Sequence, residues 1–178
     1  MKIAICGKMC SGKTTLAQTI MRMDDRYTTF SIGGKVKEVA RDLFGSTHKD
    51  RPLLIAIGAK MREIDPLVWI KYVLDQTKKE THCIVDDLRY QNEYDLLKEH
   101  GFVFIQLHVT QSIQEQRIKK LYTKDFQEHL DNRDHLSEQN TFTWSPRKEP
   151  VFHIDNREDY AKVNQKIHTF LQKNENSR

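Results

Sequence analysis

Residues 7–14 read Gly7-Lys8-Met9-Cys10-Ser11-Gly12-Lys13-Thr14 and match the pattern G-x-x-x-x-G-K-[ST]. The run before them, residues 2–6, is short and apolar and predicts a strand, while residues 14–23 predict a helix. Between a strand and a helix, this pattern binds a phosphate chain, because consecutive backbone N–H groups curl around the anion and the helix N-terminus adds its partial positive charge. The stretch therefore predicts a phosphate-binding loop rather than a chance glycine turn.

The residue types of the loop suit a nucleotide and its metal ion. Gly7 and Gly12 let the backbone turn and approach the anion where a Cβ would clash. Lys13 would reach the β- and γ-phosphates of ATP as a catalytic group, and the Thr14 hydroxyl would hold Mg²⁺. The residues predicted to bind ATP at this end of the chain are Gly7, Lys8, Cys10, Ser11, Gly12, Lys13, Thr14 and Thr15.

Strands and helices alternate along the rest of the chain. Further strands are predicted at 27–32, 82–86, 102–109 and 151–154, and helices at 35–44, 51–57, 65–78, 93–100, 112–121 and 159–171. Short strands separated by helices predict a parallel sheet that is covered on both faces. The expected fold class is α/β, a three-layer P-loop NTPase fold with a five-stranded parallel sheet, helices on both faces and a helical lid.

The bulk composition limits the class of protein. A chain of 178 residues is expected to form a single domain, 1–178, with a core of ordinary size. Its formal net charge of +4 suits anionic small molecules and is too small to predict nucleic acid binding by itself. The three cysteines show no C-x-x-C spacing, so a cytoplasmic, reducing compartment is expected. Neither a signal peptide nor a membrane partner is expected.

An acidic pair closes the third predicted strand, in Ile84-Val85-Asp86-Asp87-Leu88-Arg89. In parallel α/β sheets ligands bind beyond the carboxyl ends of the strands, where an acidic residue can orient Mg²⁺ or its waters. Asp86 and Asp87 are therefore predicted metal-side residues together with Thr14. The alternative is that one of the two caps a turn or pairs with Arg89. Arg89 itself could clamp a phosphate with two hydrogen bonds.

Several cations lie outside the loop. Lys35 and Lys37 open one predicted helix, and Arg51 and Arg62 follow in the next segments. A transfer between two phosphorylated molecules brings several negative charges together, so such a site needs cations beyond the loop lysine and exclusion of water. Taken singly, each of these side chains is also compatible with a solvated surface position.

A basic segment, Arg117-Ile118-Lys119-Lys120, ends the helix after the fourth predicted strand. Small-molecule kinases carry a closing lid in this region, and we place it at about residues 112–140. A basic helix C-terminus that complements the helix dipole explains the segment equally well.

Taken together, these motifs resemble those of the deoxynucleoside monophosphate kinases of phage and viral type, a branch of the P-loop small-molecule kinases. The similarity extends over nearly the whole chain. Besides the loop, Phe30 to Glu38 is similar to F-x-x-A-D-P-L-K-E, and Leu53 to Trp69 is similar to L-L-x-x-x-G-x-x-x-R-x-x-D-P-x-x-W. The segment from Asp87 to Glu93 resembles D-V-R-F-P-N-E. Shorter matches are the H-x-S-E-like segment at 135–138 and the I-x-N-like segment at 154–156.

The resemblance implies an ATP-dependent transfer of the γ-phosphoryl group to a (deoxy)nucleoside monophosphate, which becomes the diphosphate. It implies Arg89 and Arg117, with Lys13, as catalytic residues, and it places Asn156 on the ATP side. The residues implied on the substrate side are Lys37, Arg62, Trp69, Asp87 and Arg89. A core position is the competing interpretation of Trp69. Many relatives are dimers, so a homodimer is one expected assembly.

Two departures from the family pattern and several rival functions stay open. Gly34 stands where many relatives carry Asp, and Thr14 stands where some carry Asp after the loop lysine. In addition, Gln91 replaces the usual Pro. The same fold also serves kinases that act on dephospho-coenzyme A, phosphomevalonate or a sugar acid. A nucleotide-gated binding module without transfer activity is the rival from another class. The chain lacks the N-K-x-D guanine signature and the H-R-D and D-F-G motifs, which disfavours a GTPase and a protein kinase.

Overall fold

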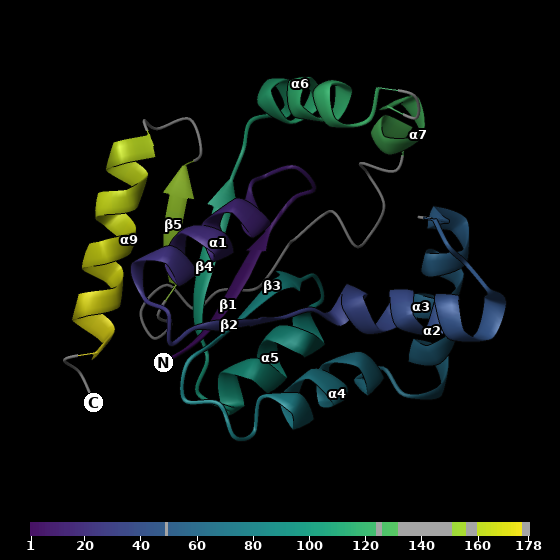
Figure 1. Cartoon of the computed structure of the whole chain (residues 1–178), viewed down its shortest axis with the longest axis horizontal. Coiled ribbons are helices and arrows are strands. Elements are labelled where there is room, and N and C mark those ends of the chain that lie inside the picture. Colours follow the sequence, from purple (N-terminus) through teal and green to yellow (C-terminus); the bar gives the residue numbers. More distant parts are fainter. Residues whose placement is uncertain (49, 124–125, 132–150, 156–159, 176–178) are drawn as a thin grey trace.

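In the computed structural model, residues 1–48, 50–123, 126–131, 151–155 and 160–175 are described (Figure 1). The strands are β1 (Lys2–Gly7), β2 (Thr28–Phe30), β3 (Cys83–Leu88), β4 (Val103–His108) and β5 (Val151–Asp155). They form one sheet in the order β2-β3-β1-β4-β5, and every pairing is parallel. The predicted α/β class with a parallel sheet is confirmed.

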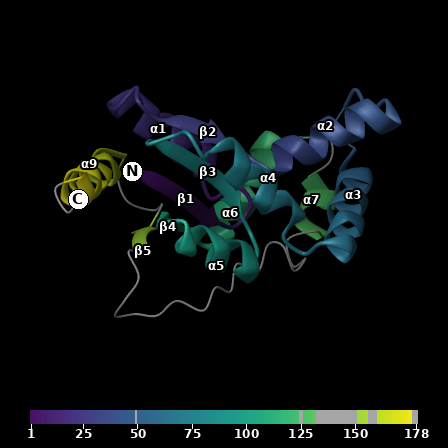
Figure 2. The ribbon, with the colours of Figure 1, turned by 90° about the horizontal axis from the view of Figure 1, so that it is seen from below.

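Helices cover both faces of this sheet (Figures 1 and 2). They are α1 (Lys13–Met23), α2 (Ile32–Phe44), α3 (Arg51–Ile64), α4 (Val68–Gln76), α5 (Gln91–Glu99), α6 (Gln111–Leu121), α7 (Phe126–Asp131) and α9 (Tyr160–Glu175). Successive side chains of a strand point to opposite faces, so Ile5 and Ala4 of β1 enter different cores. Ile5 packs in one cluster with α1 and α9, while Ala4 packs in the other with α2, α4 and α5.

The strand order places the candidate site. The central strand β1 pairs with β3 on one side and with β4 on the other. The chain leaves β1 toward β2, beyond β3, and leaves β3 toward β4, beyond β1, so the connections after these two adjacent strands run in opposite directions. Ligands of open α/β sheets bind at such a switch point. The pairing of Cys6 with Leu88 aligns the ends of β1 and β3, which brings the loop after β1 close to the acidic pair of β3.

Several helix boundaries differ from the prediction, and the largest difference lies before Asp65. Helix α3 continues past residue 57 to Ile64 and ends at Asp65, whose N–H donates to the Met61 carbonyl at 3.1 Å. The next helix therefore does not begin at the Asp-Pro pair but at Val68. A residue before proline is disfavoured in the helical conformation, so Asp65 ends α3. Its Oδ1 also accepts the Leu67 N–H at 2.9 Å, so its carboxylate caps the turn that precedes α4.

Two of the three cysteines are buried. Cys6, Cys10 and Cys83 form no disulfide bond among the described residues. Burial raises the pKa of Cys6 to about 12 and that of Cys83 to about 11, which keeps both in the unreactive thiol form at neutral pH.

In the described part of the chain, no helix has the length and apolar character needed to cross a bilayer.

Candidate functional site

The turn between β1 and α1 adopts a conformation that glycine makes accessible. Gly7 has φ +151° and Gly12 has φ +100°. A Cβ at Gly7 would lie 2.8 Å from the Leu107 carbonyl oxygen, so the tight approach of the turn to β4 requires glycine. Cys10 also has a positive φ of 58°, and the Ser11 N–H donates to the Lys8 carbonyl at 3.1 Å. This turn is the predicted phosphate-binding loop, in the predicted strand-to-helix context.

The Lys13 side chain folds back over this loop. Its Nζ donates to the carbonyl oxygen of Gly7 at 2.6 Å and to that of Lys8 at 2.9 Å. Both acceptors are neutral backbone groups, so phosphate oxygens bound in the loop could replace them with a stronger, charge-assisted interaction.

The residue after the lysine meets the end of β3. The Thr14 hydroxyl donates to Asp86 Oδ2 at 3.2 Å. Burial raises the pKa of the Asp86 carboxyl, and the neighbouring charge of Asp87 raises it further. Within the described residues, no three His, Cys, Asp or Glu side chains converge to hold a metal alone. A hydroxyl and one carboxylate fit Mg²⁺, which usually takes few protein ligands and completes its shell with phosphate oxygens and water.

Asp87 lies beside Asp86 in sequence but binds another part of the molecule. Its Oδ1 accepts the Ile32 N–H at 2.9 Å, and its Oδ2 accepts the Gly33 N–H at 2.6 Å and the Ser31 hydroxyl at 2.8 Å. A carboxylate is favourable at a helix N-terminus, where backbone N–H groups are unsatisfied. The structure thus places Asp87 on the first turn of α2, the capping alternative, and leaves Asp86 as the carboxylate that faces Thr14.

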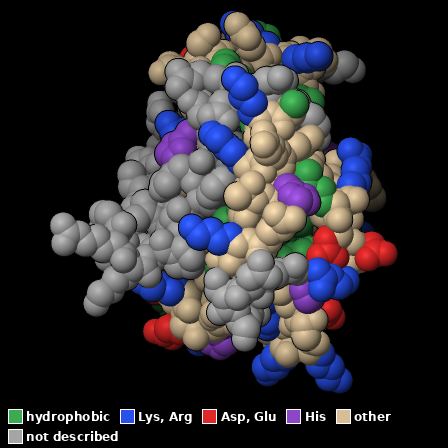
Figure 3. All heavy atoms as spheres, turned by 90° about the vertical axis from the view of Figure 1, so that its left-hand side faces the viewer, with side chains coloured by type: hydrophobic (Ala, Val, Ile, Leu, Met, Phe, Trp, Pro, Cys, Tyr) green, Lys and Arg blue, Asp and Glu red, His purple; other side chains and the backbone are tan. Residues whose placement is uncertain are grey.

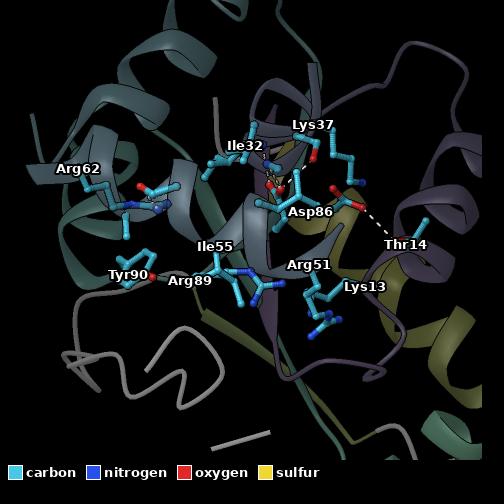
Figure 4. A pocket seen from close by; sticks show the side chains of 17 residues that line it. Lys13, Thr14, Ile32, Lys37, Arg51, Ile55, Arg62, Asp86, Arg89 and Tyr90 are labelled. Carbon is cyan, nitrogen blue, oxygen red and sulfur yellow. Dashed lines mark hydrogen bonds between the residues drawn. The ribbon is translucent and has the colours of Figure 1, made fainter. Parts of the chain in front are cut away.

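A cavity of about 470 Å³ opens on the β3 side of the loop (Figure 4). We call it the β3-side cavity, and it is walled by α2, α3 and the end of β3. Lys13 and Thr14 line it at the loop. The other cations in its wall are Lys37, Arg51, Arg62 and Arg89, and its apolar wall comprises Ile32, Val36, Leu54 and Ile55. Four segments far apart in sequence, the loop, α2, α3 and the end of β3, therefore supply the cations of one cavity.

Arg62 is held by a buried carboxylate. Its Nη2 donates to Glu93 Oε1 at 2.9 Å, its Nη1 donates to the Gly58 carbonyl at 3.1 Å, and its guanidinium lies 4.4 Å from the centre of the Tyr90 ring. The Glu93 side chain is 1% exposed and also accepts the N–H groups of Arg89 and Tyr90, both at 3.2 Å. Burial raises the pKa of Glu93, and the bond from Arg62 opposes that rise. The candidate set omitted Glu93, although its place three residues into α5 is a typical capping position.

Trp69, expected either on the substrate side or in the core, lies in the core. It is 4% exposed, packs in the cluster that contains Val73 and Leu97, and does not line the cavity. Its indole N–H donates to the Gly58 carbonyl at 3.1 Å. The Leu53-to-Trp69 segment therefore supplies Arg62 to the cavity, whereas its tryptophan links α4 to α3 in the core.

A second cavity, of about 510 Å³, lies on the other side of the loop. We call it the α9-side cavity, because α9 lines it together with the end of α6 and the start of α1. Lys13 and Thr14 line both cavities. The predicted loop residues Cys10, Gly12 and Thr15 line this one only. The loop lysine and threonine thus stand where the two cavities meet.

Helix α6 supports the loop from above. Arg117 Nη1 donates to the Cys10 carbonyl at 3.1 Å and to the Ser11 carbonyl at 3.4 Å. Gln114, which is 1% exposed, donates to the Met9 carbonyl at 2.9 Å. Sequence reasoning missed Gln114, because an isolated glutamine carries no motif. Asn156 and the 135–138 segment lie outside the described residues, as does much of the expected lid at 112–140.

The face of the molecule on the α9 side carries no continuous basic surface among its described residues (Figure 3). Its Lys and Arg side chains stand as separate groups.

Comparisons with known proteins agree with this geometry. A family model described as an AAA domain matches residues 3–139. No curated protein matches the sequence. A gluconokinase from Sinorhizobium meliloti 1021 superposes with a TM-score of 0.58 at 17% identity, covering 97% of this chain and 91% of that one.

Two further solved structures are similar. A deoxyadenosine kinase from M. mycoides, solved with dCMP and dCDP, has a TM-score of 0.55 at 20% identity and covers 97% of this chain and 100% of its own. A shikimate kinase from Acinetobacter baumannii has a TM-score of 0.55 at 18% identity, with 97% and 93% coverage. At these identities the likeness establishes the fold, that of P-loop small-molecule kinases, and leaves the substrate class open.

Proposed function

Because the chain belongs to the AAA domain family and has the fold of P-loop small-molecule kinases, we propose that it transfers the γ-phosphoryl group of ATP to a (deoxy)nucleoside monophosphate. The observation that carries the proposal is the position of Lys13 and Thr14 at the junction of two cavities. A phosphotransferase needs such a junction, because the donor and the acceptor must meet at one phosphoryl group.

The size and the walls of the cavities support nucleotides on both sides. At about 470 and 510 Å³ the two are similar in volume and in the usual range of small-ligand sites. The β3-side cavity combines an apolar wall on α2 and α3 with Lys37, Arg51 and Arg89. Such a wall suits the base of a monophosphate, and the cations suit its dianionic phosphate. A sugar acid carries one negative charge and no apolar ring, so it would leave the apolar wall without a contact and would pair with fewer of the cations.

The reaction requires alignment more than acid–base chemistry. An oxygen of the acceptor phosphate, already anionic, attacks the γ-phosphorus, and the bond from that phosphorus to the β,γ-bridging oxygen breaks with its electron pair on ADP. Lys13 would neutralise charge on the transferred group, and Arg89 would hold the acceptor phosphate. Arg117 would hold the phosphate-binding loop in place through its bonds to the loop carbonyls. Thr14 and Asp86 would hold Mg²⁺, whose charge shields the phosphates when it is bound.

Acceptor profiling with γ-labelled ATP tests the proposal. The panel comprises deoxynucleoside and nucleoside monophosphates, gluconate, shikimate, phosphomevalonate and dephospho-coenzyme A. We expect labelled nucleoside diphosphate with at least one monophosphate. Label on a sugar acid alone would establish the rival kinase function, and nucleotide binding without acceptor-dependent ADP release would establish a binding module.

A further inference from the structure

We propose that Arg51, rather than Arg62, is the catalytic arginine of α3, and that it binds the phosphate groups where the two cavities meet. The inference rests on the proposed function and names the residue that would contact both phosphorylated partners. It assigns Arg62 a positioning role in the cavity wall.

The first observation is where Arg51 lies. It is the first residue of α3 and lines the β3-side cavity with Lys13 (Figure 4). Its Nη2 lies 3.3 Å from the sulfur of Met9, a residue of the phosphate-binding loop. The guanidinium is therefore in contact with the loop and faces the neighbouring cavity, which is the position that a group bridging donor and acceptor must occupy.

The second observation is its lack of a charge partner. Among the residues that the structure describes, no carboxylate forms an ion pair with Arg51, and its buried Nε makes no hydrogen bond. A thioether sulfur is a weak acceptor, so the Met9 contact does not compensate the removal of these N–H groups from water. The adjacent Asp50 is used elsewhere, because its Oδ1 accepts the Leu53 N–H at 3.0 Å. A phosphate would satisfy this fork with two parallel bonds.

Arg62 provides the contrast within the same helix. It follows Arg51 by about three helical turns, so both side chains project from the same face of α3. Its Nε, like that of Arg51, makes no hydrogen bond, but its two Nη groups are taken by Glu93 and Gly58, and its plane stacks on Tyr90. Since Glu93 is 1% exposed and already compensates this charge, an incoming anion would have to compete with a buried carboxylate. Arg51 has no such competitor among the described side chains.

Phosphate binding and turnover of Arg51→Met test the assignment. Methionine keeps an unbranched stem as far as the position of Arg51 Nε but removes the charge, the guanidinium contact with Met9 and every donor. Arg41→Met is the matched control, because Arg41 is an exposed arginine of α2 that pairs with Asp42 and does not line the cavity. Inorganic phosphate is titrated into the protein loaded with MgADP, with the melting temperature and the heat of binding as readouts, so this arm does not depend on the identity of the acceptor.

We expect wild type and Arg41→Met to bind phosphate and Arg51→Met to lose the phosphate-dependent rise in melting temperature. Turnover with the acceptor identified by profiling should fall about 10³-fold in Arg51→Met, the lower end of the effect of a charge-stabilising arginine in phosphoryl transfer. MgADP affinity and the melting temperature without phosphate should stay at the control values, because the substitution leaves no described carboxylate without its cation.

Equal phosphate binding by Arg51→Met and the control, or no phosphate binding by wild type, would overturn the assignment. If Arg51→Met does not fold, Arg51→Lys decides, because it keeps the charge but lacks the fork and should bind phosphate about tenfold more weakly. Undiminished binding by Arg51→Lys would then count against it. If profiling shows transfer only to a sugar acid, the proposed function fails while the phosphate arm still decides the role of Arg51.

Discussion

The charged side chains of the loop after β1 and those that follow β3 have different kinds of hydrogen-bond partner. In the loop, Lys13 is held by two neutral backbone carbonyls of the same turn. After β3, two carboxylates bind segments that are distant in sequence. Asp87 binds the first turn of α2, and Glu93 binds Arg62 of α3. A charge held by neutral groups stays available to a ligand, whereas a charge already neutralised contributes to the shape of the site.

This difference separates neighbours that look alike in sequence. Asp86 and Asp87 are adjacent carboxylates, yet one meets the Thr14 hydroxyl and the other caps a helix. Arg51 and Arg62 lie on one helix, yet only Arg62 has a carboxylate partner among the described residues. Substitutions of Lys13 and Arg51 should therefore change turnover more than stability, and substitutions of Arg62 and Asp87 should do the reverse.

The largest effect is expected for Lys13→Ala. Turnover should fall by about 10³-fold, because the transferred group loses its nearest cation. The melting temperature should change little, since the carbonyls of Gly7 and Lys8 can bind water instead. Steady-state kinetics and thermal unfolding measure the two quantities. A near-normal rate would remove the loop from the mechanism.

Arg62→Met should have the largest effect on stability. It leaves the Glu93 carboxylate buried without its cation, and breaking a buried pair on one side costs about 3–5 kcal/mol of unfolding free energy. Urea titration measures the loss. The double variant with Glu93→Gln should recover part of it, because no uncompensated charge then remains. Equal stability of Arg62→Met and wild type would show that the pair does not hold the wall.

A smaller loss is expected for Asp87→Asn. The amide cannot accept at both positions, so at least one of the bonds from Ile32, Gly33 and Ser31 is lost, at about 1.5–3 kcal/mol for a bond to a charged group. Faster hydrogen exchange at the Ile32 and Gly33 amides would locate the effect in α2. If instead Mg²⁺ dependence were lost with α2 intact, Asp87 would belong to the metal side.

Asp86→Asn should shift stability least, and in the opposite direction. The folded pKa of Asp86 is raised above 3.8, so its contribution to stability is complete below that pH and is lost as the pH rises through the folded value. At pH 7 the variant should melt slightly above wild type, and the difference should vanish on acidification. Turnover should fall and need more Mg²⁺. A lower melting temperature at pH 7 would mean that the hydrogen bond from Thr14 stabilises the fold by more than the burial of the Asp86 charge destabilises it.

The predictable part of the fold and the site is the part made by near neighbours. The loop lies between a strand and a helix because its glycines and the apolar runs beside it act over a few residues. Helix α2 ends at Phe44, where the predicted helix 35–44 also ends, and Gly45 after it is left-handed. The boundaries around Asp65 were wrong, because an Asp-Pro pair can start one helix or end another and only the packing of α3 against α4 distinguishes them.

From sequence, then, one can deduce the α/β class with a parallel sheet, the phosphate-binding turn and a supply of cations around it, because periodicity and motif spacing are local properties of a chain. The fold alone settled which of two adjacent carboxylates faces Thr14, that Trp69 is a core residue, and that Glu93 neutralises Arg62. Those outcomes depend on contacts between β3, α2, α3 and α5. Such partners are set by strand order and helix packing, and a linear pattern does not encode them.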